Sequence, residues 1–348
     1  MSANAAQAAI DAHGADSALV VFTDDEEKEV NNDFAVGVHT RCLSNFGEAL
    51  TATERASIVE KLILAVRPKS VLNIDSVACW DSIVRKGGAL QLGTDLYAYL
   101  YRGDGDADGH VNDFANTHFR ESLPFLRMVY FDTLHFLESL ASEHGIPPSL
   151  RGRLVPLYQP ARVTPTVAYD SGATNRDAVI WAGRADSKTS VDLLLKIAVQ
   201  APDLTFDVFT NEAARDTKHL QDAVSSSLNL RLRGSFSSVS RLPLADYGAF
   251  LCTSISDGLS LELIEVASTG MAVVAPAIGD LAELVTSTTG WPVASYHEPE
   301  PYVQALRQIK DDSQLAISKS RCMVEHVRAR HSWTAFTNVL RASPTFID

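Results

Sequence analysis

The sequence predicts an α/β protein, with a doubly wound parallel domain in its second half and a less regular α/β region before it. Two observations lead to this prediction. From Ala178 onward, short β-rich apolar runs alternate with longer amphipathic stretches, which is the pattern of a parallel sheet with helices on both faces. At 348 residues, the chain is also long enough for two domains that each bury a core.

Six apolar runs in the second half are the expected strands of this sheet. They are AVIWAG (178–183), TFDVFT (205–210), LNLRLRG (228–234), GAFLCTS (248–254), MAVVAP (271–276) and WPVAS (291–295). In doubly wound domains, ligands bind beyond the carboxyl ends of the strands. Glycine and polar residues gather at these expected ends, for example at 183–188 and 253–258, which supports the assignment.

The first half contains fewer clear elements. We expect strands in SALVVFT (17–23), SVLNID (70–75), LYAYLYR (96–102) and RLVPLY (153–158), and helices over 55–66 and around 131–144. The second of these helices ends at Gly145, ahead of the Pro147–Pro148 pair. A Pro/Thr-rich stretch to about Thr166 predicts a hinge between domains, and two helices are expected after Glu298.

Composition argues against several classes of function. The net charge of −13 is unsuited to binding a nucleic-acid backbone or an anionic membrane, because both attract a basic surface. The four cysteines are far apart and form no CxxC pair, so we expect reduced thiols in a cytosolic protein. No apolar run approaches the ~18 residues of a membrane span, and no signal peptide is visible.

The strongest functional signal is the segment DGLSLELIEVASTGMAVVAPAIG (257–279), in which an acid and a glycine open an apolar helix. Glu265 follows Asp257 by eight positions, a little over two helical turns, so both acids can lie near one face of the helix. The free N–H groups and positive dipole end at the start of a helix suit a diphosphate, and a carboxylate further along would accept hydrogen bonds from a ribose diol. The segment therefore predicts a sugar-nucleotide site.

Three segments together carry a resemblance to a known family. WAGRADSKTSVDLLL (181–195), DGLSLELIEVASTGMAVVAPAIGDLAEL (257–284) and GWPV (290–293), in this order and spacing, resemble the donor domain of glycosyltransferase family 4. The segment LYAYLYRGDGDADG (96–109) resembles bacterial polysaccharide-synthesis members. The resemblance implies the α/β fold called GT-B, in which two Rossmann-like doubly wound domains face a cleft, here with a truncated amino-terminal domain.

The resemblance also implies a division of the chain into three parts. Residues 1–165 would form a short acceptor-side domain, and residues 166–329 the nucleotide-sugar donor domain. Residues 330–348 would form a terminal helix that packs back toward the first domain.

By the same resemblance, four charged residues would act on the donor. Arg184 and Lys188 would bind the diphosphate, so that fixed cations stabilise the charge developing on the leaving group. Asp257 would lie near the donor sugar and phosphates, and Glu265 would bind the ribose hydroxyls. The expected binding residues are Gly183, Arg184, Lys188, Gly234, Asp257, Gly258, Leu259, Ser260, Leu261 and Glu265. The donor substrate is a nucleotide diphosphate sugar, and no metal or other cofactor is implied.

Three departures from the family pattern affect this site and the first domain. Asp257 stands where the family has a glutamate, so its carboxylate reaches one methylene less far, and Lys188 lies one residue nearer Arg184 than is common. The amino-terminal half lacks the opening strand, glycine-rich loop and helix of most members. Residues 101–103 (Tyr-Arg-Gly) stand where many members have a histidine. The acceptor side is therefore short or rewired.

Each of these residues also has a purely structural interpretation. Glu265 and Arg184 would take part in ion pairs, and Lys188 would be a solvated loop residue. Ser260 would cap its helix, which is the commonest use of serine there. The run 104–109 (DGDADG) matches part of a calcium loop, but its twelfth position is Ala115 instead of glutamate, so we favour a solvated acidic turn.

The resemblance implies a retaining, metal-independent glycosyltransferase that moves a sugar from a nucleotide diphosphate sugar to a glycan, lipid-linked or protein acceptor in bacterial cell-surface polysaccharide synthesis. We expect it in the cytoplasm, with other domains or subunits of a polysaccharide synthase as partners that hold it at the inner face of the membrane. One alternative is a catalytically inactive GT-B-like module that binds or scaffolds within a larger synthase. Another is a sugar-nucleotide epimerase of the same fold.

Overall fold

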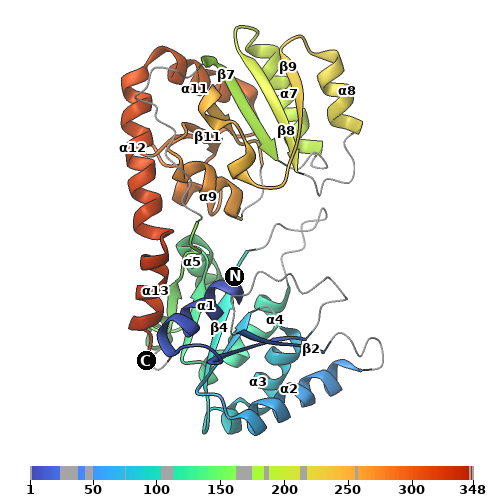
Figure 1. Cartoon of the computed structure of the whole chain (residues 1–348), viewed down its shortest axis with the longest axis vertical. Helices are drawn as coiled ribbons and strands as arrows, with labels where there is room; N and C mark the ends of the chain where they lie inside the picture. The colour runs from blue at the N-terminus through green and yellow to red at the C-terminus, as the bar shows by residue number, and fades with distance from the viewer. Residues whose placement is uncertain are drawn as a thin grey trace. The chain divides into compact units, whose positions relative to one another are not determined.

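The computed structural model describes residues 2–23, 38–43, 50–74, 76–102, 113–161, 175–183, 188–211, 218–254, 258–344 and 346. These residues form two compact units, each built around parallel strands (Figure 1). The first unit contains the described residues up to Pro160 and those from Trp333 onward, and the second contains those from Ala161 to Ser332. The domain boundary expected between residues 165 and 166 falls outside the described residues.

The second unit contains a six-stranded parallel sheet in the order β12-β11-β10-β7-β8-β9. Its strands are β7 (Asn175–Gly183), β8 (Thr205–Asn211), β9 (Leu230–Phe236), β10 (Tyr247–Leu251), β11 (Val273–Pro276) and β12 (Trp291–Val293). All six strands predicted for this half are confirmed, with ends that differ by a few residues. Counted from β7, the order is that of dinucleotide-binding domains, and it reverses between β7 and β10.

Helices of the second unit follow the strands in alternation. They are α7 (Lys188–Gln200), α8 (Lys218–Ser226), α9 (Leu261–Ser268), α10 (Leu281–Leu284), α11 (Pro299–Asp311) and α12 (Ser313–Arg330). Helix α7 packs against α11, and α9 packs against α12. The connection from β9 to β10 differs, because it contains only the short 3₁₀ turns η4 (Val239–Arg241) and η5 (Leu244–Asp246).

Burial in the sheet falls from its centre to its β9 edge. Every residue of β10 and β11 is buried, as expected for strands covered on both faces. In β9 only Leu230 and Phe236 are buried, and the five residues between them are exposed. The strand β9 therefore presents an uncovered surface.

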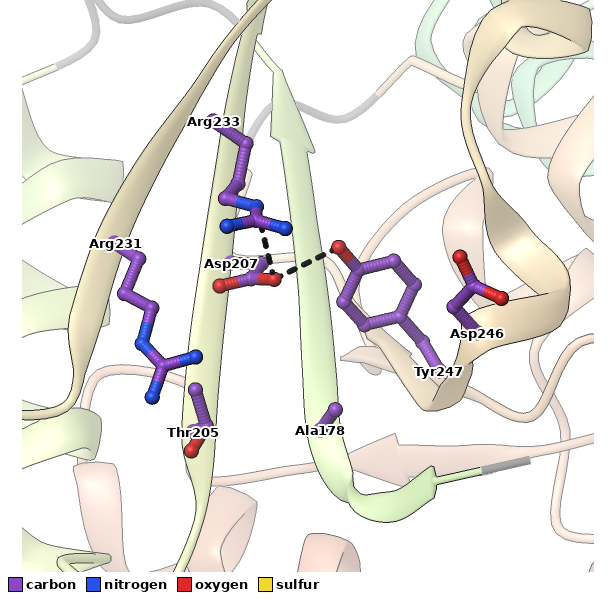
Figure 2. A pocket seen from close by; sticks show the side chains of 7 residues that line it. All are labelled: Ala178, Thr205, Asp207, Arg231, Arg233, Asp246 and Tyr247. Carbon is purple, nitrogen blue, oxygen red and sulfur yellow. Dashed lines mark hydrogen bonds and ion pairs between the residues drawn. The ribbon is translucent and has the colours of Figure 1, made fainter.

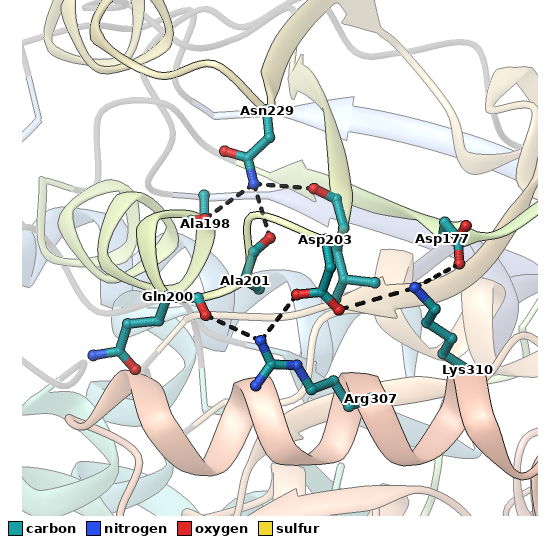
Figure 3. Close-up of polar contacts among 9 residues, drawn as sticks. Asp177, Ala198, Gln200, Ala201, Asp203, Asn229, Arg307 and Lys310 are labelled. Carbon is teal, nitrogen blue, oxygen red and sulfur yellow. Dashed lines mark hydrogen bonds and ion pairs between the residues drawn. The ribbon is translucent and has the colours of Figure 1, made fainter.

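Polar contacts attach α11 to the turn between α7 and β8 (Figure 3). Arg307 donates to Asp203 Oδ1 at 2.9 Å, and Lys310 Nζ lies 3.9 Å from Asp203 Oδ2 and 3.0 Å from Asp177 Oδ1 of β7. The hydrogen bond from Arg307 lowers the pKa of Asp203. Asn229 Nδ2 lies about 3 Å from the carbonyl oxygens of the same turn, including that of Leu204 at 3.0 Å. The turn that leads into β8 is thus held from two sides.

The first unit contains a four-stranded parallel sheet in the order β3-β4-β5-β6, and a separate parallel pair, β1 and β2. The strands are β1 (Ala18–Phe22), β2 (Val38–Cys42), β3 (Ser70–Ile74), β4 (Asp95–Leu100), β5 (Met128–Phe131) and β6 (Leu154–Pro156). The helices and turn are α1 (Ser2–His13), α2 (Ala52–Val66), α3 (Val77–Leu90), α4 (Asp113–Ser122), η2 (Leu123–Phe125), α5 (Leu134–Glu143), α6 (Pro148–Arg151) and α13 (Trp333–Ala342).

The helix expected around 131–144 is confirmed as α5, although it begins only at Leu134, because Met128–Phe131 forms the buried strand β5, which was not predicted. One prediction about elements was wrong. Three helices follow Glu298 where two were expected. The extra break lies at Asp312, whose carboxylate accepts from the N–H of Leu315 at 3.0 Å and so caps α12.

The last helix completes the core of the first unit. Phe336 and Leu340 of α13 pack with Tyr97, Tyr99 and Tyr130 of β4 and β5. Among the helices that the structure describes, none combines the length and apolar character needed to cross a membrane.

Candidate functional site

The carboxyl ends of β7 and β10 mark the point where the strand order of the second unit reverses. The two strands are neighbours, with Ala249 opposite Val179 and Phe250 opposite Ile180. Gly183 is the last residue of β7, and Leu251 is the last of β10. In open parallel sheets, connections leave such a pair in opposite directions and open a crevice, where ligands bind.

A buried chain of hydrogen bonds fixes this end of the sheet. Trp181 Nε1 donates to Thr253 Oγ1 at 2.9 Å, and Thr253 Oγ1 donates to the carbonyl oxygen of Ser190 at 2.9 Å. All three residues are buried. Since hydrogen bonds are strong where water is excluded, the chain holds the first turn of α7 beside the ends of β7 and β10. Sequence reasoning did not identify this role, because the three residues share no local spacing.

The start of α9 follows β10 and contains four of the predicted binding residues. Gly258 is buried, Leu259 packs against the core, and Leu261 is 47% exposed. Ser260 is the N-cap, and its Oγ accepts from the N–H of Leu263 at 3.2 Å. The structural interpretation of Ser260 as a cap is therefore confirmed. The cap takes one N–H of the first turn, and the others remain for a ligand or solvent.

Glu265 is half-buried on α9, between the buried Ile264 and Val266. Residues three and four apart share a helix face, so Glu265 lies on the same face as Glu262 and Leu261, both of which are exposed. The carboxylate therefore lies on the less buried face of α9, which follows the carboxyl end of β10.

Gly234 lies in β9, where the register with β8 shifts between Val208 and Phe209. Its φ of +138° is a conformation that other residues rarely adopt. A bulge in an edge strand explains this glycine without a ligand.

The structure leaves several predicted site residues untested. Arg184 and Asp257 lie outside the described residues, as do the acidic run 104–109 and His110. Lys188 is the first residue of α7, but its side chain is not among those described. Within the described ranges, no group of three or more His, Cys, Asp or Glu residues could hold a metal ion.

In the first unit, Arg102 follows β4 and makes contacts at the carboxyl ends of the strands. Its N–H donates to Asp132 Oδ2 at 3.2 Å, beyond the end of β5. Its guanidinium lies 5.0 Å from the ring centre of Phe136 in α5. The residue that follows, Gly103, lies outside the described residues.

Comparisons of the sequence with protein-family models and with curated proteins gave no match. Solved structures do match the fold. Anabaena HepE in complex with UDP has a TM-score of 0.71 at 13% identity, and the alignment covers 98% of this chain and 95% of HepE. A glycosyltransferase from Rickettsia africae has a TM-score of 0.69 at 11% identity, with 95% and 90% covered.

Staphylococcus aureus TarM has a TM-score of 0.65 at 13% identity, and the alignment covers 84% of this chain but only 58% of TarM. The chain thus spans less than two thirds of TarM. At such low identities, the likeness shows the fold alone. The α/β GT-B fold expected from the sequence is confirmed.

Proposed function

We propose that this chain is a glycosyltransferase that binds a nucleotide diphosphate sugar beyond the carboxyl ends of β7 and β10. The observation that carries the proposal is the reversal of strand order there, directly before the capped helix α9. Two solved structures of similar fold support it: HepE was crystallised with UDP-glucose, and pneumococcal GtfA, an O-GlcNAc transferase, with UDP and GlcNAc.

In the proposed site, side chains and a helix end supply the charge that the reaction needs. Arg184, Lys188 and the N–H groups at the start of α9 bind the diphosphate and stabilise its charge as it leaves. Asp257 contacts the donor sugar, and Glu265 accepts hydrogen bonds from the ribose hydroxyls. No metal is required for these steps.

Transfer proceeds with retention of anomeric configuration, by attack of the acceptor on the face that the diphosphate leaves. The leaving diphosphate helps to take the acceptor proton, and the protein contributes mainly positioning and charge stabilisation. The acceptor is a glycan, a lipid-linked acceptor or a protein, and the reaction belongs to cell-surface polysaccharide synthesis. The enzyme acts in the cytoplasm, with other domains or subunits of a synthase at the inner membrane face.

Thermal-shift measurements with UDP-, GDP-, ADP- and dTDP-sugars test the proposal. One donor should raise the melting temperature, since a ligand at 100 times its Kd stabilises the folded state by about 2.7 kcal/mol. Glu265→Ala should weaken binding on the order of tenfold, through loss of charge-assisted hydrogen bonds. The comparison is Glu262→Ala, which removes the same charge from an exposed position of the first turn of the same helix and should not weaken binding, because a carboxylate there repels the diphosphate. The proposal fails if no sugar nucleotide stabilises the chain.

A second candidate function is an inactive GT-B-like module that binds a sugar nucleotide within a larger synthase. It is favoured by the main sheet of the first unit, which has four strands in its described part against six in the second unit. Binding without hydrolysis or transfer, unchanged in Glu265→Ala, would support the module. Transfer of sugar by the isolated chain would exclude it.

A further inference from the structure

A polar pocket of about 320 Å³ lies at the amino-terminal ends of the strands in the second unit (Figure 2). It is lined by Ala178, Thr205, Asp207, Arg231, Arg233, Asp246 and Tyr247. Thr205 and Tyr247 are the first residues of β8 and β10. The proposed donor site lies beyond the other ends of these strands. A seven-residue strand such as β8 spans about 20 Å, so the pocket is a separate site.

The pocket is open because of the way β9 and β10 are connected. The link from β9 to β10 contains the turns η4 and η5 and no α-helix, and the middle of β9 is exposed. Alternation along β8 places the buried Phe206 and Val208 on one face and Asp207 on the other. Asp207 thus lies on a part of the sheet that no α-helix covers, where neighbouring side chains bury it.

Two groups already bind one oxygen of the Asp207 carboxylate, as Figure 2 shows. Tyr247 Oη donates to Asp207 Oδ2 at 2.9 Å, and Arg233 Nε lies 3.3 Å from the same oxygen. Burial, and next the hydrogen bond to Asp207, raise the pKa of Tyr247 to about 12. At neutral pH, the Tyr247 hydroxyl is therefore un-ionised, and its proton is used in the hydrogen bond to Asp207.

The other oxygen of Asp207 is the unusual feature. Asp207 is 6% exposed, and its Oδ1 is buried without a hydrogen-bond partner among the described residues. A buried carboxylate oxygen without a hydrogen-bond donor destabilises the folded state by about 1–3 kcal/mol or more. Arg231 lies directly opposite Asp207 in the sheet, yet it is exposed and forms no ion pair within the described part of the chain. The pocket thus has a buried acceptor beneath its lining and an exposed donor beside it, and the protein does not pair the two.

These two groups select the chemistry of a ligand. A hydroxyl both donates, as Asp207 Oδ1 requires, and accepts, as the guanidinium of Arg231 requires. A sulfate ion accepts but cannot donate to Asp207 Oδ1, and the two arginines and two aspartates of the lining leave no net charge that would attract an anion or a cation. Because Oδ1 is buried, a ligand reaches it only after a side chain of the lining moves, and Arg233, at 52% side-chain exposure, is free to change rotamer. We propose that this pocket binds a hydroxyl-rich saccharide unit of a neutral glycan, as a non-catalytic site.

The proposal does not depend on glycosyl transfer, since the pocket and the proposed donor site use different residues. Binding to the full chain is measured by isothermal titration with maltotriose, cellotriose and chitotriose. We expect at least one trisaccharide to bind, and Arg231→Ala to weaken it on the order of tenfold. Arg241→Ala is the matched control, because Arg241 is an exposed arginine of the same unit outside the pocket.

Asp207→Asn provides a second test, because it keeps the shape of the side chain. Its amide oxygen still accepts from Tyr247, while an NH₂ group replaces the acceptor Oδ1, so saccharide binding should fall on the order of tenfold. The proposal is overturned if none of the three saccharides binds, if Arg231→Ala binds equally well, or if sulfate displaces the saccharide. Failure of sugar-nucleotide binding, with these results intact, would overturn the proposed enzyme and leave the pocket standing.

Discussion

At the residue scale, Thr253 shows how one hydroxyl can order the proposed donor site. It accepts from Trp181 of β7 and donates to Ser190 of α7, and it is 1% exposed. Because it follows β10, it joins three elements at the point where the strand order reverses. Glu265 and the start of α9 depend on the same geometry, since they follow within the same crossover.

Thr253→Val should destabilise the protein by about 1–3 kcal/mol, because it preserves shape but leaves the buried indole N–H without an acceptor. Urea unfolding followed by tryptophan fluorescence measures the change. In the double variant Trp181→Phe/Thr253→Val, the N–H that lost its acceptor is also absent. A double-mutant cycle should then show a coupling energy above about 0.5 kcal/mol. Additive effects would contradict the role assigned to this hydrogen bond.

At the element scale, the sequence predicted strands best where the strand is buried and therefore apolar along its length. The six apolar runs of the second half became β7 to β12, because a buried parallel strand needs a continuous apolar run; β9, whose five middle residues are exposed, is the exception. In contrast, β5 was missed, since its four residues run almost directly into α5. The hydrogen bonds of Trp181 and the open pocket at Asp207 were not predicted either, because both depend on register between strands distant in sequence.

Gly234 was predicted from the sequence as a binding residue, but the structure places it in the bulge of β9. At φ +138° in the β9 bulge, Gly234→Ala should lower stability by about 1–3 kcal/mol. Gly93→Ala is the control, because an added Cβ there meets no atom within 4 Å and Gly93 has no positive φ. Gly93→Ala should be neutral or stabilising. Urea midpoints compare the two variants, and an equal response would show that the bulge does not need glycine.

At the scale of the whole molecule, the first unit is assembled from both ends of the chain. Its core joins β4 and β5 to α13, although the residues between belong largely to the second unit. Tyr97 Oη donates to the carbonyl oxygen of Pro344, and Phe346 packs on the Tyr97 ring at a centroid distance of 4.9 Å. The last residues of the chain thus stabilise a strand that lies 247 positions earlier, as the hydrogen bond between Tyr97 and Pro344 shows.

Leu340→Ala should therefore destabilise the first unit and leave the second unit intact. Leu340 is fully buried, and a buried leucine truncated to alanine costs about 2–5 kcal/mol. Hydrogen exchange with mass spectrometry should show faster exchange in β4 and β5 and no change in β7 to β11, because exchange reports local stability. Arg341→Ala, the exposed neighbour in the same helix, should change neither. Faster exchange in the second-unit sheet would instead show that α13 supports both units, and sugar-nucleotide binding would then depend on this helix as well.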